Sequence, residues 1–202
     1  MYFVRVPHII SLLLPHYKWR VDTHEIALTF DDGPNQESTP ILLDILAKAS
    51  CPSTHFLLGK QVQMNPELLS QISSKNHSVG HHTYTHLNGW QTASKIYIQD
   101  VQRACQLVKS SLFRPPYGKI RAKQWKNIQS LYPNMQCCEF NFMPGDFDSK
   151  VNTEILAQRM NRVRGGDIVV LHDRPECLVK YQPFLVDWIQ KKKAEGYTFV
   201  KL

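Results

Sequence analysis

Histidines are concentrated in one short stretch of this chain. Residues 77–86 read HSVGHHTYTH and hold four of the nine histidines. Two pairs have the i,i+4 spacing that lets two imidazoles on a helical turn bind one metal ion: His77 with His81, and His82 with His86. Strand-favouring residues and a glycine separate the first pair, so we expect His77 and His81 to flank a strand. The second pair fits a helical turn, which predicts His82 and His86 as the metal ligands.

Two adjacent carboxylates, Asp31 and Asp32, directly follow an apolar segment. Catalytic zinc sites combine three protein ligands, often histidine nitrogens and a carboxylate oxygen, and leave one position for water. One aspartate could complete such a site, while the other takes a proton from the water; the spacing leaves open which does which. This set predicts hydrolysis of a carbonyl compound, because zinc lowers the pKa of bound water towards about 7.

Hydrolysis also needs an acid for the leaving group, and His172 is suited to that role. Asp146 could hold its imidazole and keep the pKa of the ring useful, and Arg114 could pair with the base carboxylate and orient it. Each of these residues taken alone is common in turns, loops and surfaces. Their joint placement along the chain favours a catalytic site.

Strands that end at one place must position these residues. Short apolar segments predict seven strands, over residues 26–30, 54–58, 78–79, 112–113, 135–142, 168–171 and 197–200. Helical patterns lie between most of them, which predicts a parallel sheet covered by helices. The clusters around Asp31, His82, Arg114, Asp146 and His172 each follow a predicted strand. We therefore expect an α/β fold, a distorted or incomplete (β/α) barrel of about seven strands, with its site at the carboxyl rim.

The helix signals are consistent with one domain. Thr39 with Pro40, and Asn65 with Pro66, have the N-cap and first-turn proline that begin helices. Other helices are expected over about residues 92–109, 120–130, 153–163 and 178–195. We expect a catalytic domain over residues 24–202, with residues 1–23 packed on it as an N-terminal segment.

Composition and charge exclude several classes of protein. The 202 residues are 43% hydrophobic and 20% charged, as in globular domains. The net charge is +7, but the basic residues are scattered, so we expect no nucleic-acid partner. No apolar stretch reaches the roughly 18 residues of a transmembrane helix. The apolar residues near the N-terminus are interrupted by prolines, and no typical cleavage site follows, so we expect that segment to be retained.

The cysteines indicate a compartment. Their number, five, is odd, and no CxxC pair occurs, which argues against a disulfide framework and a zinc ribbon. Free buried thiols in a reducing environment are the simpler interpretation. We therefore expect a cytoplasmic protein, with the cell envelope as the alternative.

Five motifs resemble those of one family. Residues 29–34 (TFDDGP) and 82–86 (HTYTH) resemble the first two motifs of NodB-type polysaccharide deacetylases, carbohydrate esterase family 4. Residues 114–117 (RPPY), 145–147 (GDF) and 170–172 (VLH) are similar to the third, fourth and fifth motifs. The resemblance begins at about residue 24 and implies a distorted barrel with a metal-dependent deacetylase site. It implies Asp32, His82 and His86 as ligands of a divalent metal, usually Zn²⁺, with Co²⁺, Ni²⁺ or Mn²⁺ as alternatives.

The resemblance also implies catalytic roles and a substrate. Asp31 would be the general base, oriented by Arg114, and His172 the general acid, paired with Asp146. The substrate would be an N-acetylated, or O-acetylated, sugar or polysaccharide. The residues implied to contact it are Tyr117, through its backbone N–H, Pro116, Val170, Leu171 and Phe147, with Val170 and Leu171 beside the acetyl methyl group.

Three positions depart from the family pattern. His81 stands where an asparagine commonly precedes the first ligand histidine, and Met143 and Phe147 replace an aspartate and a tryptophan of the fourth motif. These changes bear on substrate range and groove shape. Two other functions stay open: a carbohydrate-binding module without turnover, and a hydrolase of small amides or cyclic imides. The complete set of ligands, acid and base favours the deacetylase.

Overall fold

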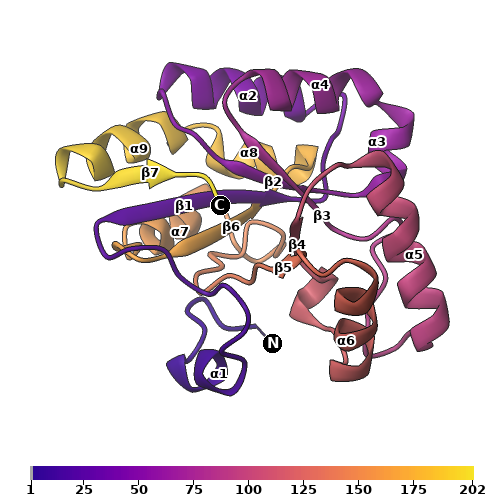
Figure 1. The fold of residues 1–202 in the computed structure, drawn as a ribbon. Coiled ribbons are helices and arrows are strands. Elements are labelled where there is room, and N and C mark those ends of the chain that lie inside the picture. The colour runs from indigo at the N-terminus through magenta and orange to yellow at the C-terminus, as the bar shows by residue number, and fades with distance from the viewer. Residues whose placement is uncertain (1) are drawn as a thin grey trace.

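Parallel strands form the central sheet of the computed structural model, which describes residues 2–202 (Figure 1). The strands are β1 (Glu25–Asp31), β2 (Thr54–Leu57), β3 (Ser78–His81), β4 (Leu112–Phe113), β5 (Gln136–Cys137), β6 (Ile168–His172) and β7 (Thr198–Val200). Their order is β5-β4-β3-β2-β1-β6, and β7 pairs with the start of β1. All the pairings are parallel, as the alternation of strands and helices predicts.

The sheet curves into an incomplete barrel. Beyond β5 the chain reaches β6 through a single parallel bridge between Phe142 and Val169. The predicted strand over residues 135–142 is therefore too long, since the regular ladder covers Gln136–Cys137. The reason is that the N-terminal segment takes the hydrogen bonds that a longer strand would use. Lys18 N donates to Cys137 O at 2.8 Å, and Glu139 N donates to Lys18 O at 2.9 Å.

Helices cover the outside of the sheet (Figure 1). They are α2 (Thr39–Lys48), α3 (Gly59–Met64), α4 (Pro66–Ser74), α5 (Ser94–Leu107), α6 (Ala122–Leu131), α7 (Thr153–Met160), α8 (Pro175–Tyr181) and α9 (Leu185–Ala194). The single helix predicted over residues 178–195 is wrong, because Pro183 lies in the turn that separates α8 from α9. The predicted N-cap Thr39 is instead the first residue of α2, and Ser38 holds the cap position.

The N-terminal segment lies against one side of the barrel. Arg5 forms an ion pair with buried Asp167 at 2.7 Å, and Val6 N donates to Asn141 O at 3.0 Å. Its short helix α1 (His8–Leu13) has no buried residue and lies apart from the other helices (Figure 1). Within residues 2–202, no helix has the length and apolarity needed to cross a membrane.

All five cysteines are free thiols, and four of them are buried. This confirms that no disulfide framework holds the fold. The core lies between the sheet and the helices that follow β1 and β6, where Leu28, Phe30 and Leu171 pack against α2 and α9 side chains such as Leu46 and Ile189.

Candidate active site

A cavity of about 610 Å³ opens at the carboxyl rim of the sheet. Strands β1 and β6 are in register there, with Asp31 opposite His172. Arg114 N donates to His81 O at 2.9 Å, which brings the end of β4 beside the end of β3. The predicted catalytic residues thus converge because neighbouring parallel strands end together.

Asp32, His82 and His86 form a compact group of potential metal ligands, with donor atoms within 4.8 Å of one another. Asp32 Oδ1 lies 3.6 Å from His82 Nε2 and 3.2 Å from His86 Nε2. Two ligand atoms bonded to one tetrahedral zinc at about 2.0–2.1 Å lie about 3.3–3.4 Å apart. The spacing of these atoms therefore fits one shared ion.

Hydrogen bonds orient both imidazoles for this purpose. His82 Nδ1 lies 2.8 Å from Arg114 O, and His86 Nδ1 lies 3.1 Å from the Tyr117 hydroxyl. The Arg114 carbonyl can only accept, so it places the His82 ring proton on Nδ1 and leaves Nε2 as the lone-pair donor, as in most metal-bound histidines. The Tyr117 hydroxyl holds the His86 ring through Nδ1. Asp32 Oδ1 is buried and has no well-aligned hydrogen-bond partner among residues 2–202. A buried oxygen in this state is costly unless a ligand satisfies it.

The backbone that carries the two histidines differs from the prediction. His82 and His86 lie in an irregular loop, not on a helical turn. Thr83 and His86 have left-handed conformations, with φ of 62° and 63°, which a right-handed helix cannot contain. The loop is held at Thr83, whose carbonyl accepts from Gly59 N at 3.0 Å. The rings still meet, with centroids 5.1 Å apart.

The alternative histidine pair lies elsewhere. His77 Nδ1 is 2.8 Å from the Ser53 hydroxyl, and His81 Nε2 is 2.8 Å from Ser110 O. Both are buried; His77 directly precedes β3 and His81 is its last residue, so the two lie at opposite ends of a strand as predicted. Neither belongs to the ligand group around Asp32.

Charges around the ligand group favour its metal-binding form. Burial would raise the pKa of the Asp32 carboxyl, but the neighbouring imidazoles of His86, His82 and His172 outweigh it and lower the pKa. Burial lowers the pKa of His82, although Asp31 and Asp32 act in the opposite direction. The carboxylate and the neutral imidazole that result are the states that bind metals.

Arg114 fixes the other aspartate. Its side chain is fully buried, and Nη1 donates to Asp31 Oδ1 at 2.8 Å. Its remaining bonds go to Thr29 Oγ1 at 2.7 Å, Cys138 O at 3.0 Å and Glu139 O at 3.2 Å. Asp31 Oδ2 then faces the ligand group, 3.9 Å from His82 Nε2. These acceptors hold the Arg114 guanidinium in place, and its hydrogen bond therefore fixes the orientation of the Asp31 carboxylate.

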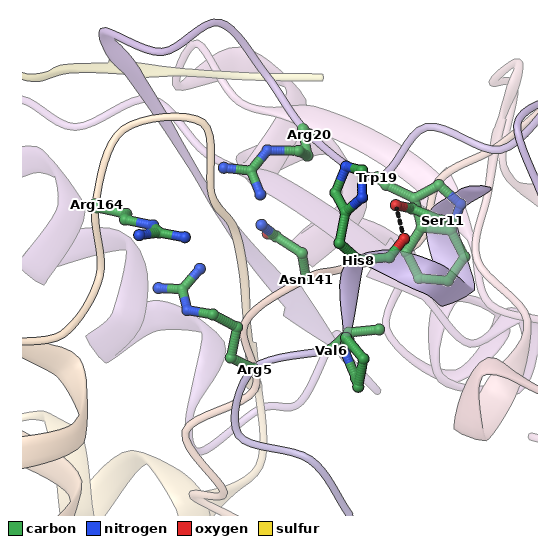
Figure 2. A pocket seen from close by; sticks show the side chains of 9 residues that line it. Arg5, Val6, His8, Ser11, Trp19, Arg20, Asn141 and Arg164 are labelled. Carbon is green, nitrogen blue, oxygen red and sulfur yellow. Dashed lines mark hydrogen bonds between the residues drawn. The ribbon is translucent and has the colours of Figure 1, made fainter.

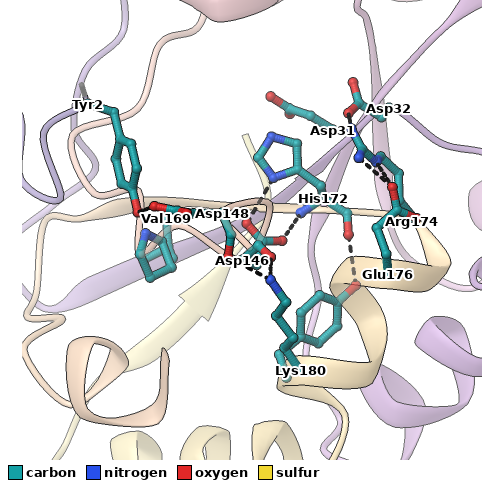
Figure 3. Close-up of polar contacts among 12 residues, drawn as sticks. Tyr2, Asp31, Asp32, Asp146, Asp148, Val169, His172, Arg174, Glu176 and Lys180 are labelled. Atoms are coloured by element: carbon teal, nitrogen blue, oxygen red, sulfur yellow. Dashed lines mark hydrogen bonds and ion pairs between the residues drawn. The ribbon is translucent and has the colours of Figure 1, made fainter. Parts of the chain in front are cut away.

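His172 is bound twice by one buried carboxylate (Figure 3). Asp146 Oδ1 lies 2.9 Å from His172 Nδ1, and Asp146 Oδ2 accepts from the His172 backbone N–H at 2.6 Å. Lys180 Nζ donates to the Asp146 carbonyl at 2.7 Å and holds the loop. Burial would lower the pKa of His172, but Asp146, and then Asp32 and Asp31, raise it to about 9. The ring is therefore a cationic acid at neutral pH.

The expected contacts with substrate are partly corrected. Tyr117, Val170 and Phe147 line the cavity, but Pro116 and Leu171 do not. Leu171 is fully buried in the core, because side chains alternate along a strand and its neighbours Val170 and His172 face the cavity. Tyr117 has a left-handed backbone, with φ of 61°, and its N–H donates to no acceptor found among residues 2–202.

Comparison with known proteins decides the family. A family model described as polysaccharide deacetylase matches residues 18–133, more than half of the chain. The chain belongs to the polysaccharide deacetylase family. A peptidoglycan-N-acetylglucosamine deacetylase of Bacillus cereus is 30% identical over 189 residues, which make up 90% of this chain and 89% of that relative.

Solved structures of polysaccharide deacetylases share the fold. A crystal structure of a peptidoglycan N-acetylglucosamine deacetylase in complex with 4-naphthalen-1-yl-N-oxidanyl-benzamide matches with a TM-score of 0.84 and 26% identity, over 96% of this chain and 94% of that one. A CE4 family pseudoenzyme from Bacillus anthracis matches with a TM-score of 0.80 and 26% identity, over 91% of this chain and 66% of that one. The resemblance to NodB-type esterases of family 4 and the incomplete barrel are confirmed. Because the fold also occurs in a pseudoenzyme, activity depends on the residues of the site.

Two of the three departures from the deacetylase motifs face the cavity. Met143 and Phe147 line it, and the Phe147 ring lies edge-on to His172 with centroids 5.2 Å apart. His81 instead points away from it, with its Nε2 on the Ser110 carbonyl. The first two replacements therefore shape the wall of this cavity, and the third does not.

Tyr2 also belongs to this site, although no sequence pattern predicts it. Its ring lines the cavity and lies 5.0 Å from the Phe147 ring. Its hydroxyl donates to Asp148 Oδ2 at 3.2 Å (Figure 3). It accepts from Arg159 Nη1 at 2.9 Å. Gly145 makes room for it, since a Cβ there would lie 2.1 Å from the hydroxyl. Tyr2 and Asp148 are 146 residues apart, and no local pattern predicts such a contact.

Asp173 and Arg174, which directly follow His172, also contribute to the site and were not predicted from the sequence. Asp173 is buried and accepts hydrogen bonds from the hydroxyls of Ser38 and Thr39 at 2.6 and 2.5 Å. It thereby ties the end of β6 to the loop that follows Asp32. Burial raises the pKa of Asp173 to about 6, against those two hydrogen bonds. Arg174 Nη1 lies 3.6 Å from Asp32 Oδ2. The signal that could have identified Asp173 and Arg174 is their position in the sequence, directly after His172.

Proposed function

We propose that the protein is a metal-dependent deacetylase that hydrolyses the acetamide of N-acetylated amino sugars in a glycan. The observation that carries this proposal is the placement of two paired groups, Asp31 with Arg114 and His172 with Asp146, beside one metal-ligand group in one cavity. The named activity of the Bacillus cereus relative supports the substrate class.

Asp32, His82 and His86 would hold the metal, and the fit of their spacing and of the His82 tautomer supports zinc. When bound, such an ion supplies Lewis acidity that polarises the acetyl carbonyl and acidifies a water molecule. Arg174, near the second oxygen of Asp32, would limit how that carboxylate turns.

Asp31 would act as the general base. Arg114 occupies its Oδ1, so Oδ2 is the oxygen that faces the ligand group and can accept a proton from the attacking water. A base positioned in this way contributes about 10²–10⁴-fold to a rate.

His172 would act as the general acid. Asp146 holds Nδ1, which leaves Nε2–H to protonate the departing amine. The pKa of about 9 keeps this proton in place at neutral pH. The Tyr117 N–H would donate to the developing oxyanion, and Val170 and Phe147 would contact the acetyl methyl group.

Release of acetate from a substrate panel tests the proposal. The panel contains N-acetylglucosamine oligomers, peptidoglycan fragments, O-acetylated xylo-oligosaccharides and a cyclic imide, each with and without a chelator. We expect acetate from an N-acetylated glycan, its loss with chelator and its return with zinc. Release only from the imide would assign a small-amide hydrolase. No turnover by metal-loaded protein, with glycan binding retained, would assign a non-catalytic module.

A further inference from the structure

A second cavity, of about 340 Å³, lies at the amino end of β6, where residues 164–167 lead into the strand. Three arginines line it: Arg5, Arg20 and Arg164. Figure 2 shows their guanidinium groups pointing towards one common space. His8 and Trp19 of the N-terminal segment complete the wall. We call this the arginine cavity. It shares no lining residue with the catalytic cavity.

One buried carboxylate, Asp167, lies beside these arginines and is already saturated. Its Oδ1 accepts from Arg5 Nη1 at 2.7 Å and Asn141 Nδ2 at 2.9 Å. Its Oδ2 accepts from Arg5 Nη2 at 2.8 Å and from the Arg164 backbone N–H at 3.0 Å. Asp167 therefore neutralises Arg5 and has little capacity for a second guanidinium.

Arg20 has only a long ion pair with Asp167, which Arg5 already neutralises, and Arg164 has no ion pair among the described residues. Arg20 Nη2 is 3.9 Å from Asp167 Oδ1, which is too long for a hydrogen bond. The Arg164 guanidinium makes no ion pair or hydrogen bond with the part of the chain that the structure describes. Gly166, which has a φ of 87°, leaves room for the Arg20 guanidinium, because a Cβ at residue 166 would lie 2.9 Å from Arg20 Nη2. Two positioned guanidiniums thus face one cavity with their donors unused.

We propose that the arginine cavity binds the phosphoryl group of an anionic ligand through Arg20 and Arg164. Planar guanidiniums match phosphoryl oxygens in paired hydrogen bonds, and two of them balance a dianion better than a carboxylate. The Trp19 ring offers an apolar wall for the group that carries the phosphate. This site is independent of the proposed deacetylase reaction.

The phosphoryl group has two sources that the structure allows. One is a soluble phosphate compound, and the other is a lipid headgroup. The position of helix α1 favours the lipid headgroup. Its residues His8 and Ser11 border the cavity. Its apolar side chains Ile9, Leu12 and Leu13 are 59%, 60% and 73% exposed. Exposed apolar side chains beside cationic ones are typical of segments that lie on anionic membranes.

Calorimetric titration with inorganic phosphate at constant ionic strength tests the site. We expect saturable binding that Arg20→Ala/Arg164→Ala weakens at least about tenfold. The matched control, Lys123→Ala/Lys126→Ala, removes the same charge from exposed positions and should bind as the unaltered protein does. All are compared in a His82→Ala background, so that phosphate at the metal ligands is not counted. Equal binding by both double variants, or no saturable binding, would overturn the site.

Co-sedimentation with vesicles distinguishes the sources. Phosphatidylglycerol vesicles are compared with phosphatidylcholine vesicles, using the double arginine variant and Leu12→Gln/Leu13→Gln. An exchange of exposed Met64 and Leu131 to Gln is the control. Sedimentation with the anionic vesicles that both variants abolish would identify the headgroup. Phosphate binding without sedimentation would identify a soluble compound. Each result supports the site when the phosphate titration is saturable, and a titration without saturable binding refutes the site whatever the vesicles show.

Discussion

Replacement of Asp146 by Asn tests the acid most directly, because it removes one charge and preserves shape. Asp146 accepts two hydrogen bonds from His172, at its backbone N–H and at Nδ1. An amide keeps one acceptor and presents an NH₂ group to the other donor. If the amide oxygen stays on the backbone N–H, the NH₂ faces Nδ1 and favours the neutral ring. Burial then lowers the pKa of His172 without the opposing charge of Asp146.

The magnitude follows from the pKa of about 9 in the unaltered protein. At about pH 7.5, a ring with that pKa is about 97% protonated, whereas one at or below the ordinary value of about 6.5 is about 9% protonated or less. An acid must be protonated to act, so activity falls as pH rises through its pKa. Asp146→Asn should move the alkaline limb from near pH 9 to about 6.5 or lower. The catalytic efficiency at about pH 7.5 should fall at least about tenfold.

The assay is acetate release as a function of pH, with metal content measured on the same samples. A bound cation near Asp32 would offset part of the charge that raises the pKa of His172, so the limb of the unaltered enzyme lies at or below pH 9. Asp148→Asn is the matched control, because Asp148 is on the same loop and bonds to Tyr2 rather than His172. If Asp146→Asn retains the alkaline limb of the control, His172 is not the acid.

Four further outcomes are expected. His82→Ala and His86→Ala should each abolish binding of the divalent ion in calorimetry, and His77→Ala should not; loss of the ion from the last variant would mean that the wrong pair was chosen. Asp31→Asn should lose about 10²–10⁴-fold in rate and stay metal-loaded, and a rate near that of the unaltered enzyme would place the base elsewhere. Tyr117→Phe removes the hydrogen-bond partner of His86 Nδ1 and should lower metal affinity about 10–100-fold in a chelator competition, and unchanged affinity would contradict this role. Unfolding without reductant should expose five titratable thiols, and a lower count would reveal a disulfide.

The catalytic rim could be predicted because parallel strands carry their following residues to one edge. Asp31, Arg114 and His172 are distant in sequence, and each directly follows a strand that the apolar pattern reveals. The register of the sheet then brings Asp31 and His172 together, since β1 and β6 end opposite each other. The position of Leu171 was predictable too, because alternation along β6 places it opposite Val170 and His172.

Other parts of the site could not be derived from local pattern. The i,i+4 spacing of His82 and His86 fits a helical turn and also fits a loop with two left-handed residues. The contacts of that loop with α3 and α5 distinguish the two. The break at Pro183 between α8 and α9 had a visible signal. No local signal predicted the position of Tyr2, because the residues that contact its side chain lie more than 140 positions away.

The seat of Tyr2 has a practical consequence for work with the purified protein. Its ring forms part of the cavity wall, so an affinity tag or fusion partner joined directly before Tyr2 would begin beside that cavity. Such an addition could displace Tyr2 from Phe147 and Asp148 and alter apparent substrate preference. The carboxyl terminus is the better attachment point, because Leu202 N bonds to Thr54 Oγ1 at the amino end of β2, at the far end of the strands from the catalytic rim.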